Sequence, residues 1–171
     1  ARTAFGVSAG DQATLYAKLL ADDPIYHKRA ELWDAKMKDI HEWLAIIKIR
    51  NPQSEICDQA VTYHESCHLT HGQKVVLQPR ELLRAIPGLK LIELPEANWC
   101  CGSAGIYNLT QPEMADQLLV RKINHIKSTG ATTVATANPG CLLQLINGAA
   151  KAGLKLRVAH PITLQIGRAH V

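Results

Sequence analysis

The sequence predicts an α/β fold in which helices flank a parallel β-sheet. From about residue 60 onward, short β-type segments alternate with helical segments, and this alternation is typical of parallel sheets. The first 50 residues carry a different pattern, in which one long amphipathic helix ends at the Asn51-Pro52 boundary. We therefore divide the chain into residues 1–50, the helical tail of an earlier module, and residues 51–165, a second module.

The first 50 residues are expected to be mainly helical. A helix should end near Leu20, and a longer one should begin at Asp22-Asp23-Pro24, where an aspartate can cap and proline suits the first helical position. Its apolar residues recur at four- and three-residue spacings and form one stripe. They are Tyr26, Ala30, Trp33, Met37, Ile40, Leu44 and Ile47. We expect the stripe to belong to a module whose other half is absent, which leaves apolar surface exposed for a partner.

The second module should contain four strands and three helices in alternation. The predicted strands are 60–63, 89–94, 132–136 and 156–159. The predicted helices are 79–85, 112–128 and 141–152. In open parallel sheets, ligands bind outside the carboxyl ends of the strands, so the residues that follow each strand are the candidates for a site.

Four of the five cysteines lie in turns marked by Gly, Pro or His, each shortly after a predicted strand. Cys67 follows the first strand, the adjacent pair Cys100 and Cys101 follows the second, and Cys141 follows the third. The four thiols should therefore meet at one edge of the sheet. The fifth, Cys57, lies in a polar linker and matches no motif.

This arrangement of thiols favours a polynuclear metal centre. A single zinc ion usually takes Cys-x-x-Cys pairs, and here Gln144 stands where the second cysteine after Cys141 would be. Adjacent cysteines suit an iron–sulfur cluster better, because neighbouring irons can each take a thiolate. Gly102 and Gly105, with Ala104 between them, would let amide groups approach the sulfides closely. Buried apolar thiols and a structural zinc module used for docking are the alternatives.

The segment His64-Glu65-Ser66-Cys67-His68 matches the His-Glu-x-x-His pattern of zinc peptidases. That chemistry needs both histidines on one face of a regular helix. Here a strand precedes the segment and Gly72 follows it soon, so we do not expect a peptidase. His64 and His68 should instead donate hydrogen bonds to sulfur or carboxylate near the cluster, or serve as structural histidines.

Composition limits the function classes. The chain has 171 residues with 47% hydrophobic and 20% charged residues, as expected of a globular domain with a real core. The net charge of +4 is spread along the chain, which argues against nucleic acid, and no apolar run is long enough for a transmembrane segment. Five cysteines without a signal peptide indicate a reducing, cytoplasmic setting. Residues 166–171 resemble a translated sequencing adapter, so we expect a non-native tail on a fragment.

Three motifs together resemble the cysteine-rich CCG domain. They are Tyr63-His64-Glu65-Ser66-Cys67-His68, Trp99-Cys100-Cys101-Gly102-Ser103-Ala104-Gly105 and Asn138-Pro139-Gly140-Cys141. This module occurs in heterodisulfide reductase, in lactate-utilisation iron–sulfur proteins and in the glycolate oxidase iron–sulfur subunit. His71-Gly72-Gln73 and Leu94-Pro95-Glu96 bring the chain nearest to the last of these. A weaker match of residues 5–11 to residues 135–141 suggests that a first CCG module ends in residues 1–50, with Asp11 in place of cysteine.

The resemblance implies an electron-transfer subunit of a flavin-dependent 2-hydroxy-acid dehydrogenase, with glycolate as the expected substrate. Cys67, Cys100, Cys101 and Cys141 would hold a cluster, expected to be [4Fe–4S], and Gly102, Gly105, His64 and His68 would surround it. FAD and substrate oxidation would reside in a partner protein, so no catalytic residue is assigned here. A ferredoxin-like domain would precede this part of the chain, and the complex would lie in the cytoplasm or at the inner membrane. Gln144 departs from the family's closing Cys-x-x-Cys, which disfavours heterodisulfide-type chemistry.

Overall fold

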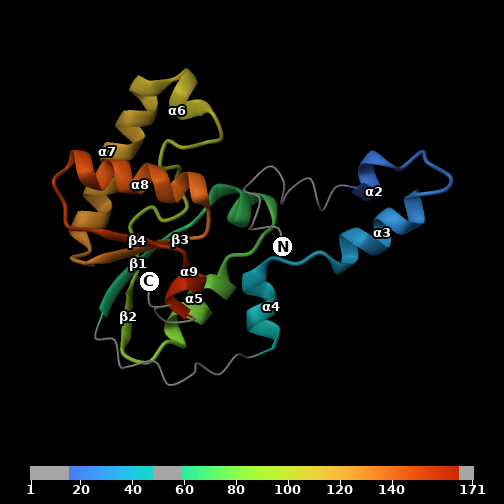
Figure 1. Ribbon diagram of the computed structural model, residues 1–171, viewed down its shortest axis with the longest axis horizontal. Helices are drawn as coiled ribbons and strands as arrows, with labels where there is room; N and C mark the ends of the chain where they lie inside the picture. The colour runs from blue at the N-terminus through green and yellow to red at the C-terminus, as the bar shows by residue number, and fades with distance from the viewer. Residues whose placement is uncertain (1–15, 48–58, 166–171) are drawn as a thin grey trace.

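The computed structural model describes residues 16–47 and 59–165, and a four-stranded parallel sheet forms its centre (Figure 1). The strand order is β2-β1-β3-β4, and every neighbouring pair is parallel. The strands are β1 (Gln59–His64), β2 (Leu89–Ile92), β3 (Thr133–Thr136) and β4 (Arg157–Ala159). The predicted α/β class with a parallel sheet is thus confirmed.

Helices cover both faces of this sheet (Figure 1). They are α7 (Pro112–Ser128) and α8 (Pro139–Lys151) on one face, and α5 (Leu77–Arg84) and α9 (Pro161–Gln165) on the other. Successive residues of β3 show the division, since Val134 packs with residues of α7 and α8 and Ala135 with residues of α5. All four residues of β3 are buried, as expected of a strand covered on both faces.

The predicted helices of the second module agree with the structure to within two residues at each end, but three short helical segments were not predicted. These segments are η2 (His68–Gly72), which is a π-helical turn, α6 (Tyr107–Thr110) and α9. Within the described residues, no helix combines the length and the apolar character needed to cross a bilayer. The match of residues 5–11, Cys57 and the tail 166–171 all lie outside the described residues.

The single long helix predicted after Asp22-Asp23-Pro24 is wrong, because the chain forms two helices there, α3 (His27–Lys36) and α4 (Ile40–Ile46). The first begins later than predicted, since Asp23 Oδ1 accepts the N–H groups of residues 25 and 26 at 2.8 and 2.7 Å and closes a turn instead. The shorter α2 (Tyr16–Leu19) precedes this turn.

The break between α3 and α4 is made by a buried aspartate. Asp39 has extended backbone and caps α4, where its side chain and that of Glu42 form a reciprocal capping box. Asp39 Oδ1 also lies 2.6 Å from His41 Nδ1, and both residues are fully buried. A continuous helix would remove both the cap and the contact between Asp39 and the His41 ring.

The apolar stripe of the N-terminal helices is partly exposed. Ala30 is buried, whereas Tyr26, Trp33 and Ile47 are 49%, 52% and 54% exposed. The expected exposure of apolar surface is therefore confirmed, and the need for a partner and the division into modules at residue 50 remain predictions.

Replacing Asp39 tests the origin of the helix break. Asp39→Ala removes the cap and leaves the buried His41 ring without its carboxylate, so we expect a loss of about 2 kcal/mol or more in the free energy of unfolding. Asp39→Ser keeps a capping oxygen and should lose less. Urea unfolding followed by circular dichroism measures both, and an Asp39→Ala chain as stable as the parent would contradict the assignment.

Candidate metal centre

The four predicted cysteines meet at the carboxyl edge of the sheet. Cys67 lies shortly after β1, Cys100 and Cys101 follow β2, and Cys141 lies in the first turn of α8 after β3. Neighbouring cysteines shift one another's pKa values in series, Cys67 with Cys100, Cys100 with Cys101 and Cys101 with Cys141, so the four side chains lie close together. All four are free thiols. Segments far apart in the sequence therefore contribute sulfur atoms to one cluster, which we call the thiol cluster.

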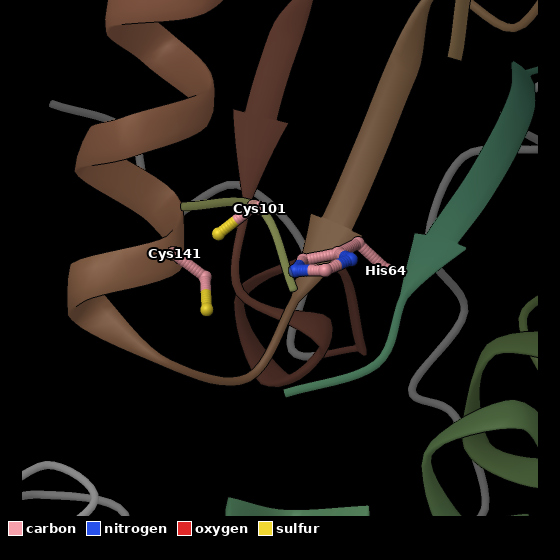
Figure 2. A group of neighbouring side chains, drawn as sticks. All are labelled: His64, Cys101 and Cys141. Atoms are coloured by element: carbon pink, nitrogen blue, oxygen red, sulfur yellow. The ribbon is translucent and has the colours of Figure 1, made fainter. Parts of the chain in front are cut away.

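His64 extends the thiol cluster on its buried side. It is the last residue of β1 and is fully buried. Its ring lies beside the side chains of Cys101 and Cys141, as Figure 2 shows. One potential ligand atom from each of these three residues lies within 4.8 Å of the other two. His68 is also buried, at the start of η2, but among the described residues it is not part of this group.

Hydrogen bonds tie the three cysteine-bearing loops to one another. The N–H of Glu65 donates to the carbonyl of Ala97 at 3.0 Å, which joins the Cys67 loop to the segment before Cys100. Ser66 Oγ lies 3.4 Å from Thr136 Oγ1 and joins the same loop to the end of β3. These contacts fix the relative positions of the loops that carry the thiols.

Cys141 is positioned by the start of α8. Asn138 caps the helix, and its Oδ1 accepts the N–H of Cys141 at 3.0 Å. Pro139 occupies the first turn, where its missing N–H costs nothing. Gly140 follows, and a Cβ there would lie 2.7 Å from Ser103 Oγ, so glycine lets the Cys100–Cys101 loop approach the helix.

Backbone amides of the Cys100–Cys101 loop point at cysteine sulfur atoms. Its N–H donates to Cys100 Sγ at 3.2 Å, and the amides of Ala104 and Ser103 interact with Cys100 and Cys101 respectively. Gly102 has φ +90°, and a Cβ there would collide with the carbonyl oxygen of Ala115 in α7. Gly105 also has positive φ, +65°, but a Cβ there would meet open space.

Interactions within the thiol cluster shift the pKa values of its four cysteines in opposite directions. The pKa of Cys100 is strongly lowered, chiefly because the thiols of Cys101 and Cys67 donate to it. The pKa of Cys141 is lowered by the Cys101 thiol and then by His64, while burial acts in the opposite sense. The pKa values of Cys67 and Cys101 are raised by their bonds to Cys100. The lowered pKa values favour the thiolate form at Cys100 and Cys141, and thiolate is the form that binds metal.

A buried lysine accompanies these thiolates. Lys122 of α7 is 2% exposed, and its ammonium group donates to the carbonyl oxygen of Glu96 in the loop before Cys100. Burial lowers the pKa of Lys122, while attraction to the Cys101 sulfur and other nearby anionic groups opposes that shift. Sequence patterns did not single out this residue, because a lysine within an amphipathic helix usually faces water.

The peptidase pattern does not form a peptidase site. His64 lies in a strand and His68 begins a π-helical turn, so the two histidines do not share the face of a regular helix. Glu65 is bound instead to Arg80, with 2.6 Å between Oε1 and the guanidinium, and to the Thr70 hydroxyl at 3.1 Å. This carboxylate holds the loop to α5 rather than serving as a free base.

Comparison with known proteins agrees with the geometry. Residues 61–146 match the cysteine-rich domain called CCG. The chain is 41% identical over 150 residues to the "Probable glycolate oxidase iron-sulfur subunit" of Bacillus subtilis, covering 86% of this chain and 34% of that protein. It is 32% identical over 146 residues to "Lactate utilization protein A" of Halalkalibacterium halodurans, covering 85% and 59%. A fumarate reductase (CoM/CoB) subunit of Methanothermobacter marburgensis is 38% identical over 116 residues, covering 68% and 24%. The chain thus spans from about a quarter to three fifths of the length of these relatives.

Gly102 and Gly105 form a matched pair for testing the loop. Alanine at either position meets backbone strain of roughly 1–2 kcal/mol or more, because φ is positive at both. Only Gly102→Ala also collides with the backbone of Ala115 and must displace the Cys100–Cys101 loop. We expect Gly102→Ala to lose most of its bound metal after anaerobic reconstitution and Gly105→Ala to keep most of it. Equal metal contents in the two variants would show that the contact with α7 does not position the cysteines.

Proposed function

Because the chain belongs to the family of the cysteine-rich CCG domain, we propose that it is an iron–sulfur electron-transfer protein. Cys67, Cys100, Cys101 and Cys141 are the proposed ligands of one cluster, of the [4Fe–4S] type. The observation that supports this most directly is the gathering of the four interacting thiols at one edge of the sheet. Four thiolates are the usual protein ligands of such a cluster.

The surroundings of the thiols also fit a cluster. When bound, an iron–sulfur cluster supplies one-electron redox chemistry. The amides of Gly102, Ser103 and Ala104 are the kind of donors that stabilise anionic sulfur. Lys122 places a positive charge near the same sulfurs. Cys101 and Cys141 are 1% and 7% exposed, so the chain itself excludes water from one side of the site.

The relatives point to the partner and substrate class. Two carry the names glycolate oxidase iron-sulfur subunit and lactate utilization protein A, and both names refer to 2-hydroxy acids. We propose that the chain passes electrons from a flavin-containing dehydrogenase subunit that oxidises a 2-hydroxy acid, with glycolate as the preferred candidate. In this proposal FAD is held by that subunit, and a ferredoxin-like domain belongs to the same full-length chain. The location in the cell stays a prediction.

A structural zinc site is the second candidate. The observation in its favour is the buried group of His64, Cys101 and Cys141, since zinc accepts mixed nitrogen and sulfur ligands. Thiol–disulfide chemistry of the heterodisulfide reductase type has less support, because Gln144 replaces the last cysteine of the pattern and is buried in α8.

Serine substitutions test the proposed function. Replacing any one of Cys67, Cys100, Cys101 or Cys141 removes a soft ligand that iron prefers, so each variant should lose iron and the broad visible absorption of a cluster. Stability should fall with the iron, because a site built from three loops couples metal binding to folding. Cys57→Ser is the control and should match the parent in iron content. Full reconstitution of the Cys100→Ser and Cys101→Ser chains would refute the cluster.

Lys122 provides a test of redox tuning. Its positive charge favours the reduced, more negative cluster, so Lys122→Met should lower the reduction potential by on the order of 50 mV. The exposed Lys127, also on α7, is the matched control, and Lys127→Met should leave the potential nearly unchanged. Potentiometric titration followed by electron paramagnetic resonance measures both. A potential that rises in Lys122→Met would contradict the proposed role.

A further inference from the structure

The His64 imidazole has no conventional partner. It is fully buried, and neither ring nitrogen forms a hydrogen bond to an oxygen or nitrogen atom among the described residues. The polar groups that it faces are the thiols of Cys101 and Cys141 (Figure 2). Leaving a buried polar atom without a partner costs about 1–3 kcal/mol, so a histidine placed this way requires an explanation.

A hydrogen bond to sulfur accounts for only one of the two ring nitrogens of His64. A neutral imidazole has one N–H donor and one nitrogen lone pair. The N–H can donate to the sulfur of Cys141, which lies beside the ring. The lone pair needs either a proton donor or a metal. Once Cys101 has lost its proton to bind metal, it can no longer donate, and a lone pair facing a thiolate would be repelled.

We propose that His64 is a direct metal ligand, and that one ring nitrogen binds the metal on the buried side of the thiol cluster, beside Cys101 and Cys141. The site then has four sulfur donors and one nitrogen donor. This inference rests on the proposed function only where it takes the metal to be iron. That His64 binds a metal does not depend on the proposed function. Four cysteines already supply one ligand to each iron of a [4Fe–4S] cluster, so the nitrogen is an additional donor that makes the iron it binds distinct from the others.

The test uses the whole chain reconstituted anaerobically with iron and sulfide. One sample carries natural-abundance histidine and a second carries ¹⁵N-histidine, and pulsed electron paramagnetic resonance of the reduced cluster measures the nitrogen couplings. Direct ligation predicts one strongly coupled nitrogen whose signal changes with the isotope and disappears in His64→Gln. The exposed His71 supplies the control, and His71→Gln should keep the signal. The labelled parent chain decides the question even where His64→Gln does not fold. A weakly coupled nitrogen, as produced by a hydrogen bond to sulfur, would overturn the proposal.

A second arm with Co²⁺ alone separates this inference from the proposed function. Imidazole and thiolate ligands of Co²⁺ give distinct absorption bands, and His64→Gln should alter them and weaken Co²⁺ binding by about tenfold or more. If no iron–sulfur cluster assembles but Co²⁺ binding depends on His64, the proposed function fails and the ligand assignment stands. If the cluster assembles without a strongly coupled nitrogen, the ligand assignment fails and the proposed function stands.

Discussion

The parallel pairing of β1 with both β2 and β3 is the constraint on which the metal centre depends. Val61 of β1 pairs with Leu91 of β2 and with Thr133 of β3, so the three strands end at nearly the same level. The loops that follow them carry Cys67, the Cys100–Cys101 pair and Cys141. No local motif brings these thiols together, because they are separated by long crossover connections. The sheet register is what turns three distant turns into one site.

The site is then stabilised by groups that tolerate or compensate negative charge. The amides of Gly102 and its neighbours, the buried Lys122 and the His64 ring all converge on the sulfurs. Interactions among the thiols lower the pKa values of Cys100 and Cys141 and so favour their thiolate forms. In the proposed function, metal binding at these cysteines would release the remaining thiol protons, which would link metal affinity to pH and to folding. The geometry is therefore that of a chain whose loops are arranged for a metal.

Most of the second module could be predicted from the sequence, because its strands and helices alternate and its cysteines follow strand ends. The break between α3 and α4 could not, because the apolar stripe runs through it without interruption. An aspartate at position 39 would also be expected on the exposed face of one continuous helix. Only the structure shows that Asp39 is buried against His41. The burial of Lys122 and the position of His64 beside Cys101 and Cys141 could not be predicted from the sequence for the same reason. The motif indicated that His64 or His68 would lie near sulfur. Only the structure shows that His64, at the end of β1, is the one beside Cys101 and Cys141.

The central claim is that the thiol cluster holds iron and sulfide rather than zinc. The most direct measurement is the content of iron, zinc and acid-labile sulfide in the chain isolated under strictly anaerobic conditions. The account predicts iron and sulfide in equal amounts, about four of each per chain for a [4Fe–4S] cluster. Stoichiometric zinc without sulfide would contradict it, and would assign the same cysteines and His64 to a structural zinc site.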